Sequence, residues 1–218
     1  MKKLFMIIAT CLLTGVFSTA QKPRFGFTAG DVFANYTTKL AGETDNADAK
    51  TGITAGILVD IPAGKHFSFQ PAMNFVQKGT KSEQTSGGTT EKYQITVNSI
   101  EVPLNLLYNA SGNTGNFFIG AGPSLAFALS GKSKFDDGTI SDTEDLKIGN
   151  GDGDDLKGLD LGANFMTGYC FPNGLFLSFN YNKGLSNLFP GGSSDFTFKS
   201  DYFGVKLGYL LKGKKQPK

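Results

Sequence analysis

The chain has few of the residues that build most catalytic sites: one histidine, two cysteines and no tryptophan in 218 residues. General acid–base and nucleophilic catalysis usually needs a histidine within hydrogen-bond reach of its partner. The single histidine, His66, follows a Pro-Ala-Gly-Lys turn at the opposite end of the predicted strands from the long loops. We therefore interpret His66 as a solvated turn residue, and we expect no enzymatic activity and no cofactor.

Long apolar runs are also scarce, and none after residue 20 reaches the roughly 20 residues that a membrane-spanning helix needs. The chain begins with a pair of lysines, an apolar run over 4–13 and the small residues Ser18-Thr19-Ala20. A positive, an apolar and a small-residue region in this order are typical of a secretory signal peptide. We predict that residues 1–20 are such a signal and that residues 21–218 form one exported domain.

Two other interpretations of this N-terminal segment fit less well. A retained membrane anchor would need an uninterrupted apolar run, which Thr10, Thr14 and Gly15 break. A lipoprotein would need a small residue directly before Cys11, where Thr10 stands. Cys11 is therefore expected to leave with the signal, and Cys170 alone cannot form an intramolecular disulfide.

The composition excludes one class of partner and favours one class of fold. A net charge of +2, without a basic patch interleaved with aromatic residues, argues against nucleic acid. The chain contains 29 glycines, 20 phenylalanines and 7 tyrosines, which suits short alternating segments better than helices. We therefore predict an all-β protein.

Alternation of apolar and polar residues with a period of two marks eight segments as strands. In the clearest one, Ile53, Ile57 and Val59 share one face, while the residues between them are mainly small or polar. Asp31 breaks the alternation of the first strand, so we expect a β-bulge near it or a strand whose register the alternation does not fix. The predicted strands are 25–36, 51–61, 67–78, 93–108, 116–129, 159–169, 175–183 and 202–211.

The connections between these strands alternate in length. Short turns lie at 62–65, 109–115 and 171–174, and long polar loops lie at 39–50, 80–92, 130–157 and 187–199. Outer-membrane barrels have short periplasmic turns and long extracellular loops. We therefore predict an eight-stranded antiparallel up-and-down transmembrane β-barrel. The acidic loop between Gly131 and Lys157 has few apolar residues, so we expect it to be poorly ordered without a partner.

A soluble lipocalin-like barrel is the alternative, and it differs in which face of each strand looks inward. Here bulky Ile, Leu and Phe lie opposite a face rich in glycine and small polar residues, which suits a narrow lumen and a lipid-facing outside. Tyrosines near the strand ends, Tyr36 and Tyr202 among them, are interpreted as interfacial girdles. The residues predicted to face lipid include Ile57, Phe69, Leu104 and Val205.

The predicted lumen is too narrow for a general porin, because eight strands leave an interior filled by side chains. Glu101 and Lys206 fall on the inward face of strands on opposite walls, so we predict a buried ion pair between them. We expect Asn105, Asn164 and Asn180 to complete this lumen network. A proton or ion path along the same residues is the functional alternative.

The longest loop contains Asn150-Gly151-Asp152-Gly153-Asp154-Asp155, whose alternating oxygen ligands resemble the start of a calcium loop. Asn150, Asp152 and Asp154 are the candidate ligands. However, Asp155 stands where such a loop needs glycine, and Leu161 stands where it needs glutamate. We therefore interpret the segment as a solvated acidic loop and predict no metal site.

Several short segments, taken together, resemble the PorT-like outer-membrane β-barrel family of Gram-negative bacteria. They are Phe67-Ser68-Phe69-Gln70-Pro71, Gln77-Lys78-Gly79, Ile100-Glu101-Val102-Pro103-Leu104, Gly120-Ala121-Gly122-Pro123, Asp160-Leu161-Gly162 and Tyr181-Asn182-Lys183-Gly184-Leu185-Ser186-Asn187. The first strand departs from the family pattern, with Val32 where a polar inward residue is common. The resemblance implies an eight-stranded barrel that is inserted by the outer-membrane assembly machinery. It also implies a family that includes a component linked to protein secretion.

Elimination of the other classes leaves a non-enzymatic structural or interaction role at the cell envelope, carried by long extracellular loops. The resemblance adds one alternative, an accessory component of an outer-membrane protein secretion system. A soluble, lipocalin-like ligand-binding barrel is a further alternative. The expected partners are outer-membrane lipid, the outer-membrane assembly machinery, and an envelope or secretion protein.

Overall fold

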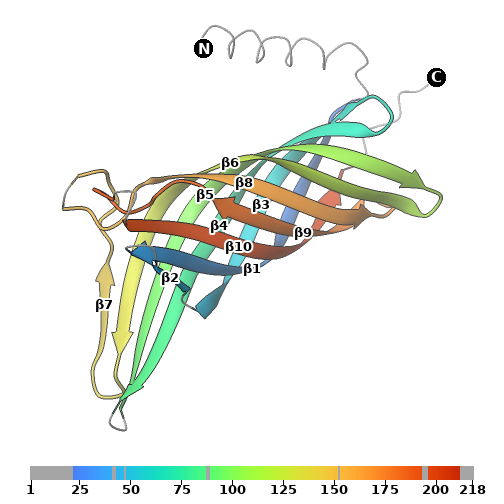
Figure 1. Ribbon diagram of the computed structural model, residues 1–218. Helices are drawn as coiled ribbons and strands as arrows, with labels where there is room; N and C mark the ends of the chain where they lie inside the picture. The colour runs from blue at the N-terminus through green and yellow to red at the C-terminus, as the bar shows by residue number, and fades with distance from the viewer. Residues whose placement is uncertain are drawn as a thin grey trace, which may run out of the picture.

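The computed structural model describes residues 22–40, 43–46, 48–86, 89–151, 153–192 and 196–211. These residues form ten strands in one sheet (Figure 1). The strands are β1 (Arg24–Leu40), β2 (Glu43–Asn46), β3 (Asp48–Ala63), β4 (Phe67–Ser86), β5 (Thr89–Gly112), β6 (Gly115–Asp136), β7 (Ser141–Asp145), β8 (Leu159–Cys170), β9 (Leu175–Gly184) and β10 (Phe196–Leu210). No helix in this part of the chain is long and apolar enough to cross a membrane.

Eight of the strands close into a ring because the last strand pairs with the first. Neighbours follow the order β1, β3, β4, β5, β6, β8, β9 and β10, and β10 pairs back with β1 from Gly26↔Leu210 to Leu40↔Phe196. All of these pairs are antiparallel. The two short strands are extensions, β2 pairing with β1 and β7 with β6. The predicted eight-stranded up-and-down barrel is therefore confirmed.

The wall of the barrel is apolar outside and polar inside, as the alternation predicts. On β9, for example, Ser178, Asn180 and Asn182 are buried, whereas Phe179 and Tyr181 are exposed. The four residues predicted to face lipid lie on the outer surface, with Ile57 exposed and Phe69, Leu104 and Val205 half-exposed. A soluble barrel would have the opposite arrangement. The lipocalin-like alternative is therefore wrong.

Side chains fill the interior in layers. Near the short turns, one apolar cluster consists of Leu58, Leu107, Phe118, Met166, Phe176 and Leu210. A second cluster, of Val32, Ala34, Val76 and Tyr202, lies further along the lumen. The cluster nearest the long hairpins, which we call the outer cap, consists of Tyr36, Val97, Leu156 and Leu188. The polar residues of the lumen therefore lie between apolar layers.

The predicted bulge at Asp31 is wrong. Strand β1 pairs without a register shift against both neighbours, and Asp31 lies opposite Val205 on β10 and Ile53 on β3. Register shifts occur instead between β3 and β4 and between β5 and β6. Asp31 breaks the apolar pattern but not the pleat, so its exposed side chain points outward.

Much of the predicted loop structure is strand. The β4–β5 hairpin is paired up to Ser86↔Thr89, and β6 continues to Asp136 and pairs with β7. Figure 1 shows these hairpins extending well beyond the ring. The expectation of a poorly ordered segment between Gly131 and Lys157 is wrong for 132–136 and Ser141–Asp145, which pair as strands, and for Leu156, which is buried in the outer cap.

The interpretation of Tyr36 and Tyr202 as girdle residues is also wrong. Both side chains are 2% exposed and face the lumen. Even-numbered positions of β1 and of β10 point inward, which the exposed Phe33 and Phe203 beside them make clear. Tyr36 and Tyr202 therefore contribute their rings to the interior rather than to an interfacial girdle.

Prolines interrupt three neighbouring strand interfaces on one side of the wall. Pro71, Pro103 and Pro123 lie where residue pairing pauses between β3 and β4, β4 and β5, and β5 and β6, respectively. Proline has no amide hydrogen to donate to a neighbouring strand. By contrast, β1 pairs without a break with both β10 and β3. The barrel therefore has a continuous side around β1 and an interrupted side around β5.

Candidate functional site

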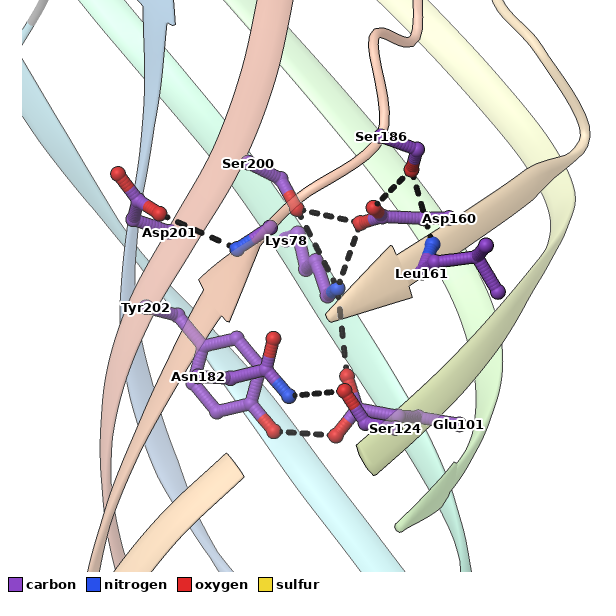
Figure 2. A network of polar contacts seen from close by, with 11 residues as sticks. Lys78, Glu101, Ser124, Asp160, Leu161, Asn182, Ser186, Ser200, Asp201 and Tyr202 are labelled. Carbon is purple, nitrogen blue, oxygen red and sulfur yellow. Dashed lines mark hydrogen bonds and ion pairs between the residues drawn. The ribbon is translucent and has the colours of Figure 1, made fainter. Parts of the chain in front are cut away.

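The candidate site is a network of buried charges and hydroxyl groups in the lumen (Figure 2). At its centre is Lys78 of β4, whose Nζ lies 3.2 Å from Oε2 of Glu101 on β5 and 3.4 Å from Oδ2 of Asp160 on β8. The side chains of Lys78 and Glu101 are 3% and 1% exposed. A charge removed from water is costly unless it is paired, so one lysine compensates two carboxylates on different strands.

The hydroxyl of Tyr202 completes the environment of Glu101 and Lys78. It donates a 2.5 Å hydrogen bond to Oε1 of Glu101. The ammonium of Lys78 also lies 5.3 Å from the centre of the Tyr202 ring, within the range of a cation–π interaction. Tyr202 therefore binds both members of the ion pair and ties β10 to β4 and β5 through the lumen.

Asp160 connects this ion pair to the chain that follows β9. Ser200 on β10 and Ser186 donate hydrogen bonds of 2.6 and 2.9 Å to the two oxygens of the Asp160 carboxylate. Ser186 in turn accepts a 2.8 Å bond from the Leu161 amide (Figure 2). The network thus fixes the position where the chain leaves β9 for the outer end of the barrel.

The predicted pairing of Glu101 with Lys206 has the wrong lysine. Lys206 is 5% exposed and, within the described residues, forms no ion pair or hydrogen bond. It lines a cavity of about 20 Å³ together with Asn74 and Asn180, which is room for one water molecule. Glu101 instead pairs with Lys78 of the neighbouring strand β4. The Cα partner of Glu101 is Asn74, so the long Lys78 side chain reaches the carboxylate diagonally from four residues further along β4.

The predicted asparagines are inward but only partly connected. Asn164 donates a 2.9 Å hydrogen bond to Asn105, which in turn donates one of 3.3 Å to the sulfur of Met166. Asn180 accepts a long bond of 3.5 Å from Ser178. These amides form a layer below the charged network. The structure brings Asn105 and Asn164 together as expected and leaves Asn180 with another partner.

Sequence reasoning missed Lys78, Asp160 and Tyr202. A signal was present for Lys78, because it continues the inward series of Asn74 and Val76 on β4. Tyr202 could have been placed in the same way, since it shares its face with Lys206. Their mutual contacts, however, depend on how far neighbouring strands are shifted along each other, and alternation alone does not specify that shift.

The acidic loop offers no metal centre in the part that the structure describes. Oδ2 of Asp154 accepts a 2.7 Å hydrogen bond from the Gly151 amide, as in an ordinary turn, and Asn150 is exposed. Asp152, the third candidate ligand, lies outside the described residues. Within them, no three His, Cys, Asp or Glu side chains come close enough to hold an ion.

Other polar residues of interest lie away from the lumen network. His66 is an exposed turn residue, with Nδ1 3.3 Å from the Asn109 carbonyl. Cys170 is a free cysteine at the end of β8. In the β6–β7 hairpin, hydrogen bonds from the amides of Ile140 and Thr139 lower the pKa of the Asp137 carboxyl. None of these groups contacts the network described above.

We predict that the free energy of unfolding couples Glu101 to Lys78 more strongly than to Lys206. Lys78→Met should destabilise the barrel by roughly 3–5 kcal/mol, because it leaves two carboxylates without their cation. In urea unfolding from lipid vesicles, Glu101→Gln combined with Lys78→Met should cost clearly less than the sum of the single changes. Glu101→Gln combined with Lys206→Met is the matched control, and stronger coupling there would restore the pair expected from the sequence.

One family model matches this chain, and several solved structures are similar to it. The family model described as outer membrane protein beta-barrel domain matches residues 19–190. Ail of Yersinia pestis is similar at 12% identity and a TM-score of 0.42, over 88% of this chain and 100% of Ail. Neisserial surface protein A is 12% identical with a TM-score of 0.41, over 87% of this chain and 99% of that one. The barrel domain of Pseudomonas aeruginosa OprF is 8% identical with a TM-score of 0.37, over 88% and 100%.

Curated protein sequences gave no match. The family match spans most of the chain and agrees with the closed ring and its apolar outer surface. The chain therefore belongs to the family of outer membrane protein beta-barrel domains and lies in the outer membrane of the cell.

Proposed function

We propose that this protein is a non-enzymatic interaction protein of the outer membrane, with a plugged barrel that holds two long hairpins outside the cell. The observation that carries the proposal is the length of those hairpins. Strands β4 and β5 pair as far as Ser86↔Thr89, and β6 is extended by its pairing with β7 (Figure 1). A barrel that only had to span the bilayer needs strands of about 9–11 residues.

The hairpins form a platform whose strands contact one another. Tyr93 of β5 and Phe135 of β6 have ring centres 4.9 Å apart, and Thr85 and Thr90 share a 3.0 Å hydrogen bond near the tip of β4–β5. Most of their exposed side chains are polar, with Tyr93 and Ile140 as apolar exceptions. They can therefore form the hydrogen bonds and ion pairs of a wet protein interface. We infer that an envelope or external protein binds here.

The outer cap supports the platform from below. Leu156 and Leu188 are 4% and 3% exposed, and the Tyr36 ring stacks on Phe198 at 4.7 Å. These contacts fasten the loops after β7 and β9 to the barrel wall. With the lumen network beneath them, they leave an interior filled by side chains, which favours a plug over a proton or ion path.

The same proposal implies how the barrel is oriented in the outer membrane and how the chain is exported and inserted. The short turns would lie in the periplasm, together with both ends of the described chain, as in other barrels with an even number of strands. Residues 1–20 would act as the signal peptide for export, and the outer-membrane assembly machinery would insert the barrel. The resemblance of this N-terminal segment to secretory signals supports this route.

The PorT-like resemblance supports a second candidate function, an accessory role in an outer-membrane protein secretion system. One of the resembling segments ends in Ser186-Asn187, and its structural role is clear. The Asn187 side chain donates to the Phe196 carbonyl at 2.8 Å and accepts from the Phe198 amide at 2.9 Å. This segment shapes the connection between β9 and β10, so it is equally compatible with both candidates.

We expect the long hairpins to be reachable from outside intact cells. In a Cys170→Ser background, a membrane-impermeant maleimide should label Thr85→Cys on β4 in intact cells. Ala63→Cys, at the short turn after β3, should be labelled only after the outer membrane is permeabilised. The reverse pattern would invert the orientation and remove the platform from the cell surface.

The interaction itself is testable on cells with a photo-reactive amino acid at Thr85. Irradiation should give a discrete adduct with a protein of the envelope or the medium. The same substitution at Ala63 is the matched control and should not give that adduct. Adducts limited to components of a secretion system would favour the second candidate. No adduct from position 85, in cells where the barrel is folded, would contradict the proposed function.

A further inference from the structure

Asp31 is a charged residue on an otherwise apolar stretch of the outer surface. The outward positions of β1, from the short-turn end, are Phe25, Phe27, Ala29, Asp31 and Phe33. All five are exposed. A carboxylate within the bilayer is energetically unfavourable and, where it occurs, is normally paired or functional. The pleat of β1 explains why residue 31 points outward. It does not explain why that outward residue is a carboxylate.

Asp31 lies inside the apolar band rather than at its edge. It is flanked along the strand by Ala29 and Phe33 and across the neighbouring strands by Val205 and Ile53. Seven residues separate it from Arg24, or about 23 Å along the strand. With a strand tilt of about 40°, this is about 18 Å of height in an apolar band of about 25 Å.

The barrel itself offers Asp31 no cation. In the part of the chain that the structure describes, Asp31 forms no ion pair and no hydrogen bond. Lys183, the outward lysine of nearby β9, is already bound by Asp201 at 2.7 Å. Lys206 is on the neighbouring strand but faces the lumen and is buried. A cation for Asp31 must therefore come from another molecule.

The same face of the barrel is hollowed beside Asp31. A groove of about 430 Å³ runs over β1, β3 and β4 on the outer surface, toward the short turns. Phe27, Ile57, Pro71 and Met73 are among the residues that line it. Between the groove and Asp31 the outward residues are small, Ala29 and Ala55. Concave apolar surface and a lone carboxylate thus lie on adjoining parts of one face.

We propose that this face binds a membrane-spanning segment of another protein, which places a lysine or arginine against Asp31 and apolar side chains in the groove. Charge complementarity selects this occupant. An acyl chain would fill the groove but would leave Asp31 unpaired. Among the described residues, a second copy of this chain would bring no free cation to the same depth, because Lys183 is paired at the edge of the band. The surface is on the wall of the barrel and is independent of the platform proposed above.

The probe for this site is a synthetic transmembrane helix of leucine and alanine that carries one lysine at the depth of Asp31. Its matched control has leucine in place of that lysine. Energy transfer between labelled helix and purified full-length barrel would measure association in phosphatidylcholine vesicles. The lysine helix should associate at least tenfold more strongly than its control, and Asp31→Asn should abolish that preference.

Two further variants make the result specific. Glu83→Gln, which removes an exposed carboxylate of the β4–β5 hairpin, should leave the tenfold preference unchanged. Asp31→Leu should raise the urea midpoint of the barrel without the probe, because it removes a charge from the apolar band. Equal association of both helices, or a preference that survives Asp31→Asn, would overturn the proposal. Self-association of the native barrel that depends on Asp31 would overturn it in favour of a second copy.

Discussion

The pairing of β10 with β1 is the constraint on which the rest of the structure depends. Hydrocarbon supplies no hydrogen-bond partners, so a sheet can cross a membrane only if it has no free edge. Continuous pairing from Gly26↔Leu210 to Leu40↔Phe196 removes the two edges that an open sheet would have. Once the ring is closed, each residue of a strand faces either lipid or the lumen. The alternation of apolar and polar residues in the sequence therefore places apolar side chains against lipid and polar side chains in the lumen.

The lumen then behaves as a small polar core. Its two inward acids near the outer end, Glu101 and Asp160, are held by Lys78 and by three hydroxyl groups, two from β10 and one from the segment after β9. Such a network is rigid because each buried charge would be costly without its partners. It links β4, β5, β8 and β10 across the interior, in addition to the pairing of neighbours around the wall. The contacts of this network therefore both fill the lumen and hold the base of the long hairpins in place.

The sequence predicts the parts of this structure that depend on local alternation. Eight strands and the outward position of Ile57 follow from a period of two, and both are confirmed. The exchange of Lys206 for Lys78 as partner of Glu101 shows what alternation omits, because alternation does not say which inward side chains along neighbouring strands reach one another. The β6–β7 pairing was missed for a different reason: a polar strand in water has no apolar face to mark it. Asp31 was misread because a charge on the outside was taken for a change of register.

The interpretation of every side chain as inward or outward depends on the register of the closing strands, and an engineered disulfide tests that register directly. In a Cys170→Ser background, Ala29→Cys and Leu207→Cys lie directly opposite each other on β1 and β10. Opposed residues have Cα atoms about 4.5–5.5 Å apart, within the range that a disulfide spans. Mild oxidation of the folded barrel should therefore cross-link this pair nearly completely. Ala29→Cys with Phe203→Cys, about 13 Å further along the strand, should not cross-link. A cross-link in the second pair, or none in either, would contradict the closed ring described here.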